Sequence, residues 1–169
     1  MPALLEVREL SVSYPSFSLH PLSFRMEAGE ILSVVGESGS GKTTLLKGLA
    51  CLTGRETRVS GQVLLNGREL LTLSEKERRP LRMTEFSVAF QNSGAWLNPS
   101  MRLRSQLGEV LSRKYRAKEQ PRLMEELMEA VGLEAEDLNR YPHELSGGMT
   151  QRFLLAMAMA LEPGLVLLD

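Results

Sequence analysis

The eight residues from Gly36 to Thr43, GESGSGKT, constrain the fold of this 169-residue chain more than any other segment. An almost continuously apolar run at 31–35 precedes them and predicts a strand buried on both faces of a parallel sheet. Leucines at helical spacing follow and predict a helix over 43–52. A strand, a loop of the form G-x-x-x-x-G-K-[ST] and a helix, in this order, place backbone N–H groups and a helix N-terminus around a polyphosphate.

The side chains of this motif indicate how a nucleotide would be held. We expect Lys42 to reach the β- and γ-phosphates and Thr43 to bind Mg²⁺. The nucleotide-binding residues predicted in the loop are Gly36, Glu37, Ser38, Gly39, Ser40, Gly41, Lys42, Thr43 and Thr44. GTPases, kinases and motor ATPases share the motif, so it predicts a nucleotide-binding superfamily and no particular reaction.

Composition narrows the range of partners. The 20 Lys and Arg nearly balance the 21 Asp and Glu, so no excess charge favours nucleic acid or an anionic membrane surface. Cys51 is the only cysteine, which excludes an internal disulfide and a cysteine-based zinc cluster. The longest apolar run, 153–161, is too short to span a bilayer, and we expect no export signal at the N-terminus. A role at a membrane would therefore need a separate membrane-embedded partner.

The hydrophobic pattern along the rest of the chain predicts an α/β domain. Segments with strand character lie at 5–14, 19–26, 61–67 and 86–91, and a helical, charged region runs from 101 to 131. The first two segments predict paired outer strands, and the third closes on Asn-Gly, a strong hairpin signal. Continuously apolar strands alternating with helices favour a parallel core, interrupted here by a helical subdomain.

A second glycine-containing motif, LSGGMTQR at 145–152, precedes another predicted helix. Ser146 can cap that helix, while Gly147 and Gly148 expose backbone N–H groups toward an anion. The octet resembles the signature sequence of ABC ATPases, in the LSGGM-x-QR form of many importer ATPases, with Met149 in place of the commoner glutamine. The three residues 146–148 are thus predicted to form a second phosphate-recognition surface.

Three further residues match the ABC pattern in the order of the family. The resemblance implies that Tyr14 stacks on adenine, that Gln91 contacts Mg²⁺ and the attacking water, and that Asp169 holds Mg²⁺ through water. An edge-strand tyrosine, a loop glutamine or an apolar strand ending in aspartate is common by itself. The matches together cover nearly the whole chain. They imply catalytic roles for Lys42, Gln91 and Asp169, and metal binding by Thr43, Gln91 and Asp169.

The resemblance also implies an architecture: an α/β P-loop NTPase (RecA-like) core with an antiparallel β subdomain and a helical subdomain insertion, C-terminally incomplete. We expect a single, partial ABC ATPase domain. Its predicted parts are a nucleotide-binding core with β subdomain at 1–91, a helical subdomain at 92–145, and a signature helix with the Walker B strand at 146–169.

The same resemblance implies a function and partners. It describes an ATPase that uses ATP and Mg²⁺ and pairs with a second ABC ATPase subunit, identical or different. Such a subunit binds membrane permease subunits at the cytoplasmic face of the cell membrane, serves an external substrate-binding protein indirectly and binds no nucleic acid. The segments Asn98-Pro99, Gln106 with Glu109, and Tyr141 to Glu144 resemble the importer branch for peptides, nickel or metal chelates.

Two expectations remain open at this stage. The sequence ends at Asp169, before the glutamate that polarises water in the family, so we expect residues 1–169 to bind ATP without competent hydrolysis. A non-transport ABC ATPase, or another P-loop protein such as a kinase or GTPase, is the alternative. The codons beyond Asp169 and the neighbouring genes would discriminate among these classes.

Overall fold

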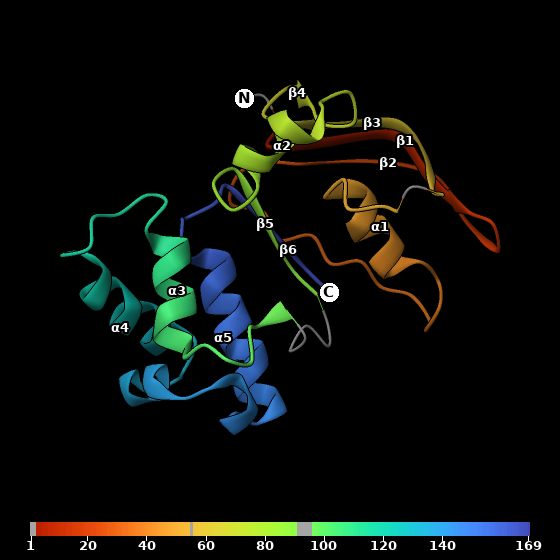
Figure 1. Cartoon of the computed structure of the whole chain (residues 1–169). Coiled ribbons are helices and arrows are strands. Elements are labelled where there is room, and N and C mark those ends of the chain that lie inside the picture. Colours follow the sequence, from red (N-terminus) through yellow and green to blue (C-terminus); the bar gives the residue numbers. More distant parts are fainter. Residues whose placement is uncertain (1–2, 55, 91–95) are drawn as a thin grey trace. The chain divides into compact units, whose positions relative to one another are not determined.

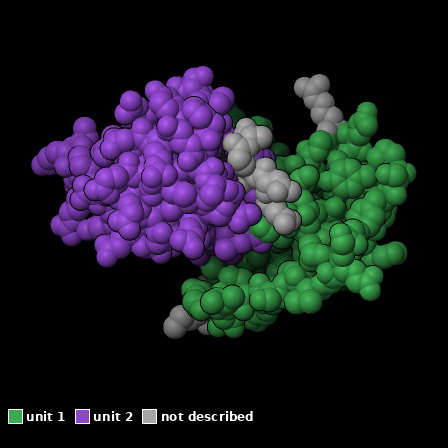
Figure 2. Space-filling view, turned by 90° about the horizontal axis from the view of Figure 1, so that it is seen from below, with its two compact units in different colours: residues 1–81, 169 green, residues 82–168 purple. Residues whose placement is uncertain are grey.

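The computed structural model describes residues 3–54, 56–90 and 96–169, shown as a ribbon in Figure 1. The chain divides into two compact units, which Figure 2 colours separately. The first comprises residues 1–81 together with 169, and the second comprises 82–168.

The first unit contains an antiparallel sheet of four strands. In chain order these are β1 (Leu5–Tyr14), β2 (Phe17–Met26), β3 (Arg58–Leu65) and β4 (Arg68–Glu69). Their spatial order is β2-β1-β3-β4, and all neighbouring strands are antiparallel (Figure 1). The prediction that 5–14 and 19–26 form paired strands is confirmed. The Asn66-Gly67 turn between β3 and β4 has the positive φ angles, 50° and 78°, that favour this dipeptide in hairpins.

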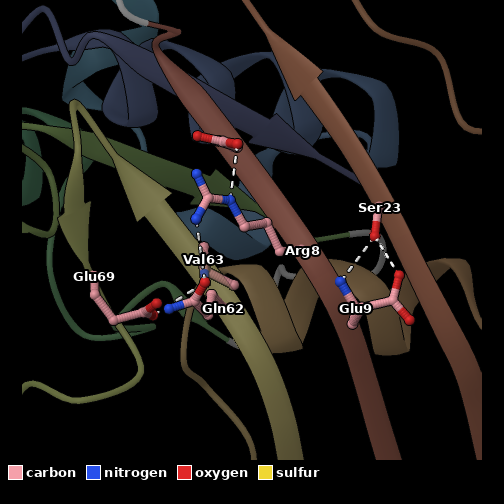
Figure 3. Close-up of polar contacts among 7 residues, drawn as sticks. Arg8, Glu9, Ser23, Gln62, Val63 and Glu69 are labelled. Atoms are coloured by element: carbon pink, nitrogen blue, oxygen red, sulfur yellow. Dashed lines mark hydrogen bonds and ion pairs between the residues drawn. The ribbon is translucent and has the colours of Figure 1, made fainter.

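Strand β1 carries a bulge at Glu9, where its register against both neighbouring strands shifts. Glu9 has a φ of 48°, and Gly61 of β3 has a φ of 96°. A Cβ atom at Gly61 would overlap the carbonyl oxygens of Arg8 and Glu9, so only glycine allows the strands to approach here. The Ser23 hydroxyl of β2 accepts the Glu9 N–H and donates to the Glu9 carboxylate, at 2.8 Å each (Figure 3). The bulge is therefore held from both neighbouring strands.

Two helices belong to the first unit, α1 (Lys42–Leu49) and α2 (Glu75–Leu81). The helix predicted over 43–52 is confirmed as α1, although it ends at Leu49. Its apolar face is buried, and it packs on β1, where a Cβ atom at Gly48 would lie 2.8 Å from Cγ2 of Val12. The core of this unit is formed by buried aliphatic residues of the sheet and of α1: Leu5, Val7, Leu10, Val12, Val63, Leu65, Leu45, Leu46 and Leu49.

The strand predicted at 31–35 is wrong for this structure. These residues adopt no strand conformation, and Ile31 and Val35 are 95% and 93% exposed. A strand can be buried on both faces only when hydrogen-bonded neighbours and covering helices surround it. None of the described strands pairs with this segment. Its apolar sequence alone was therefore insufficient to form the element.

The second unit combines two parallel strands with helices. Its strands are β5 (Phe86–Ala89) and β6 (Leu165–Leu168), and its helices are α3 (Leu103–Leu111), α4 (Gln120–Ala130) and α5 (Gly147–Met159). Short 3-10 turns lie at Ala135–Asn139 and Pro142–Glu144. The predicted strand near 86–91, a strand near the C-terminal end of 146–169, and the helical region between them are confirmed. A common core joins the three helices: Leu97, Leu103, Leu107, Leu111, Met124, Met128, Leu133, Leu138, Phe153 and Ala160.

None of the helices in the described part of the chain has both the length and the apolar character required to cross a bilayer.

Candidate functional site

The loop that precedes α1 has the backbone shape of a phosphate cradle. A turn closes from the Ser40 N–H to the Glu37 carbonyl, 3.2 Å away. Gly39 and Gly41 have φ angles of 82° and 101°, which glycine adopts without strain. A Cβ atom at Gly36 would lie 2.7 Å from Oγ of Ser40. Gly39 and Gly41 are thus required by their backbone conformation, whereas a side chain at Gly36 would displace the Ser40 hydroxyl.

The start of α1 offers backbone donors to an anion. Gly41 is the N-cap residue and supplies no side-chain cap, while its carbonyl accepts the Leu45 N–H at 2.8 Å. The first N–H groups of a helix have no acceptor within the helix. Those of Lys42, Thr43 and Thr44 are therefore positioned for a phosphate group, at the positive end of the helix dipole.

The Lys42 side chain folds back over the loop. Its ammonium group donates to the carbonyl oxygens of Gly36 at 2.8 Å and of Glu37 at 2.7 Å. The charge therefore lies inside the curve of the loop, where the sequence predicted that it would meet the β- and γ-phosphates. Ser38 and Ser40, also predicted to contact the nucleotide, are exposed on the same loop.

Thr43 and Asp169 are brought together although 126 residues separate them. The Thr43 hydroxyl donates to Oδ2 of Asp169 at 2.7 Å. A hydroxyl and a carboxylate are the oxygen ligands that Mg²⁺ accepts, so this pair fits the metal that the sequence predicts. Gln91, the third predicted ligand, lies outside the described residues.

Tyr14, the predicted adenine contact, lies at the end of β1 and is partly buried. It pairs with Phe17, the first residue of β2, across the hairpin. Phe17 and Leu19 lie against the phosphate loop, because a Cβ atom at Gly41 would be 2.9 Å from the Phe17 ring and 3.2 Å from the Leu19 side chain. The sequence reasoning did not single out Phe17 or Leu19, since contacts between a hairpin and a distant loop leave no local pattern.

The second motif forms the start of α5 in the second unit. Oγ of Ser146 accepts the Met149 N–H at 3.3 Å, so Ser146 is the N-cap residue, as its type predicts. Gly147 and Gly148 are exposed, and a Cβ atom at either would meet no other atom within 4 Å. This helix start is therefore open on its surface.

Arg152, the last residue of the octet, has a role that its motif did not reveal. Its guanidinium donates to the Gly132 carbonyl at 3.1 Å, just beyond the end of α4. A cation at this position satisfies a carbonyl at a helix C-terminus. The side chain thereby fixes α5 relative to α4.

Among the segments that resemble the peptide and nickel importer branch, residues 98–101 form a turn that Gln106 holds in place. The buried Gln106 amide accepts the Asn98 N–H at 2.9 Å and donates to the carbonyls of Asn98 at 3.1 Å and Met101 at 2.9 Å. One side chain thus satisfies three backbone groups and holds the turn that precedes α3. The hydrogen bonds of Gln106 therefore indicate a structural role in this turn, and they give no evidence of a contact with cargo.

Comparison with known proteins places this geometry in context. Residues 19–169 match the family described as ABC transporter. The chain is 37% identical to the dipeptide transport ATP-binding protein DppD of Lactococcus lactis, over 98% of this chain and 51% of that protein. It is 39% identical to the oligopeptide transport ATP-binding protein OppD of Salmonella typhimurium, over 98% of this chain and 52% of that protein. The chain spans about half the length of the curated relatives it matches.

Solved structures support the same fold. The dimeric structure of MJ0796, a bacterial ABC transporter cassette, aligns with a TM-score of 0.84 at 26% identity, over 98% of this chain and 73% of that one. A post-hydrolysis state of the same cassette, bound to ADP and Pi, aligns with a TM-score of 0.82 at 25% identity and the same coverage. The predicted α/β P-loop fold is confirmed by these neighbours.

Proposed function

Because the chain belongs to the ABC transporter family, we propose that it is the ATP-binding part of an importer that takes up peptides. The observation that carries the proposal is the loop at 36–43. Its glycine conformations, the helix start and the inward Lys42 ammonium together form an anion site. Relatives named as peptide transport ATP-binding proteins supply the cargo class.

Binding of a triphosphate at this loop would give the Lys42 ammonium phosphate oxygens as hydrogen-bond acceptors in place of backbone carbonyls. The Lys42 ammonium is now bound by two neutral carbonyls, of Gly36 and Glu37. Hydrogen bonds to charged phosphate oxygens are shorter and stronger than those to neutral carbonyls. Lys42 can therefore turn from the loop backbone toward the β- and γ-phosphates, while the first N–H groups of α1 hold the oxygens opposite.

Mg²⁺ would be held by the Thr43 hydroxyl and the Asp169 carboxylate, with Gln91 as a further proposed ligand. Proteins bind Mg²⁺ through few side chains, together with water and substrate phosphates, so two converging oxygens suffice. When bound, the ion neutralises charge on the phosphates. In the present arrangement Asp169 accepts a hydrogen bond from the Thr43 hydroxyl, and both groups would exchange this contact for one to the ion.

The motif at 145–152 supports pairing of this chain with a second ABC subunit. Its exposed helix start, with Ser146 as cap, can bind the phosphates of a nucleotide held by a second ABC subunit, identical or different. Nucleotide would then join two cassettes, which in turn bind permease subunits at the cytoplasmic face of the membrane. An external binding protein would deliver peptides. Nickel and metal chelates belong to the proposed cargo range only through the branch resemblance.

Lys42→Ala tests nucleotide binding. We expect the full chain to bind Mg-ATP and the variant to lose about tenfold to a hundredfold in affinity, the usual effect of removing a charged hydrogen bond. Lys47→Ala removes the same charge in the last turn of α1 and is expected to bind as the wild type does. Calorimetric titration measures both. Equal affinities of Lys42→Ala and wild type would refute the proposed site.

The cargo is tested in cells that carry the gene. Disrupting it is expected to abolish uptake of labelled oligopeptides and to leave amino-acid uptake intact. Intact peptide uptake with lost nickel uptake would transfer the proposal to metal import. Deficient hydrolysis by residues 1–169 stays a prediction, which a phosphate-release assay with the Lys42→Ala variant as background would check.

A further inference from the structure

The beginning of β2 touches the phosphate loop at its last glycine. With a Cβ atom at Gly41, the distance to Cζ of Phe17 would be 2.9 Å, and to Cδ1 of Leu19 it would be 3.2 Å. Such distances leave no room for a side chain, so the aromatic ring lies directly on the Gly41 backbone. Gly41 has a φ of 101° and is the residue from which α1 starts.

The same pair of strands touches α1 a second time. Val12, which pairs with Leu19 across the β1–β2 register, would lie 2.8 Å from a Cβ atom at Gly48. Gly48 follows Gly41 by seven residues, which is about two helical turns, so the two glycines lie on the same side of α1. The hairpin therefore holds α1 near both of its ends, through two positions without side chains.

The contact at Gly41 bears on phosphate binding because of its place in the chain. The N–H groups of the first turn and the Lys42 side chain follow Gly41 immediately. Binding sites require their donors to be held in place by packed neighbours. We propose that Phe17 is a positioning residue for the phosphate loop: its ring fixes the Gly41 backbone, and so the α1 donors, without touching the nucleotide. This inference rests on the proposed function of the same loop.

A role through the loop can be separated from a contact with the base. Tyr14, the neighbour of Phe17 across the hairpin, is the residue proposed to stack on adenine. Inorganic tripolyphosphate has neither base nor ribose. If Phe17 acts through Gly41, Phe17→Ala weakens ATP and tripolyphosphate by the same factor. Tyr14→Ala weakens ATP alone.

The experiment titrates the full chain with Mg-ATP and with Mg-tripolyphosphate by calorimetry. We expect Phe17→Ala to lose about fivefold to thirtyfold in affinity for both ligands. Phe17→Leu, whose shorter side chain retains part of the contact, is expected to show a smaller loss, again equal for both. His20→Ala is the control, because His20 is an exposed residue of the same strand. Circular dichroism confirms that each variant is folded.

Two results would overturn the inference. One is a folded Phe17→Ala protein, or Phe17→Leu if the alanine variant does not fold, that binds both ligands as tightly as wild type. The other is a variant that loses ATP affinity and keeps tripolyphosphate affinity, which would make Phe17 a base contact. Failure of the proposed function looks different: wild type would then bind neither ligand, or Lys42→Ala would bind both normally.

Discussion

At the scale of single residues, Lys114 shows how one cation can secure a helix end. Its ammonium donates to the Leu161 carbonyl at 3.0 Å and to the Glu162 carboxylate at 2.7 Å. The hydrogen bond from Lys114 lowers the pKa of Glu162, and the bond to Glu162 raises the pKa of Lys114. Because the pKa of Glu162 is lower in the folded protein than in the unfolded protein, its ionisation stabilises the fold at pH values above the unfolded pKa. This contribution is lost as pH falls through the folded pKa. For the raised lysine pKa, the contribution is lost as pH rises through the folded value.

Glu162→Gln is expected to lower stability slightly at neutral pH, where both partners are charged. The effect is small because the pair is largely exposed, with side-chain exposures of 40% and 74%. We expect the difference from wild type to shrink as pH falls through the lowered pKa of Glu162, because the wild-type carboxylate then takes up a proton and loses its charge. Urea unfolding at several pH values measures it, with the exposed Glu125→Gln as control. A difference that is constant across pH would show that charge is not its cause.

At the scale of elements, α1 can pack closely on β1 because Gly48 has no side chain. Glycine inside a helix costs about 1 kcal/mol relative to alanine, so Gly48 weakens α1 considered alone. The residue is nevertheless suited to its place, because Val12 of β1 occupies the space that a methyl group would need. Helix propensity and packing therefore favour different residues at this position.

Gly48→Ala tests which effect is larger. We expect it to destabilise the protein by about 1–3 kcal/mol, since the new methyl group overlaps the Val12 side chain. Combining it with Val12→Ala removes the overlap and is expected to cost less than the two single changes added together. Urea unfolding provides the free energies, with Lys47→Ala as a helix control. A more stable Gly48→Ala protein would mean that propensity dominates.

At the scale of the whole molecule, each unit has a core of its own. Leu10 is fully buried in the first unit, and Leu107 is fully buried in the hydrophobic core of the second. Separate cores allow the two units to open with different free energies.

Leu107→Ala is expected to destabilise the second unit by about 2–5 kcal/mol, the usual cost of a cavity at a fully buried leucine. Amide exchange should accelerate in α3, α4 and α5 and stay unchanged in β1 and β3. Leu10→Ala is the matched change in the first unit and should give the opposite pattern. Equal acceleration in both units by either variant would show that they unfold as one cooperative body.

The sequence alone predicted the features that depend on residues close together in the chain. The loop at 36–43, the Asn66-Gly67 turn and the Ser146 cap each follow from a few neighbouring residues, whose side chains and φ preferences act locally. The family resemblance added the order of the motifs and so the fold class. The apolar pattern at 31–35 predicted a strand that the structure does not contain, because burial of a strand depends on partners far away in the sequence.

Tertiary structure decided how distant residues meet. The family resemblance implied that Thr43 and Asp169 bind one Mg²⁺ ion, and the structure adds the direct hydrogen bond that joins this helix start to the residue after the last strand. The Glu9 bulge depends on Gly61 in another strand, and the Gly41 backbone is covered by the ring of Phe17. None of these contacts leaves a periodic trace in the sequence, because each depends on how close two folded backbones come. How close they come is set by the packing of whole elements against one another.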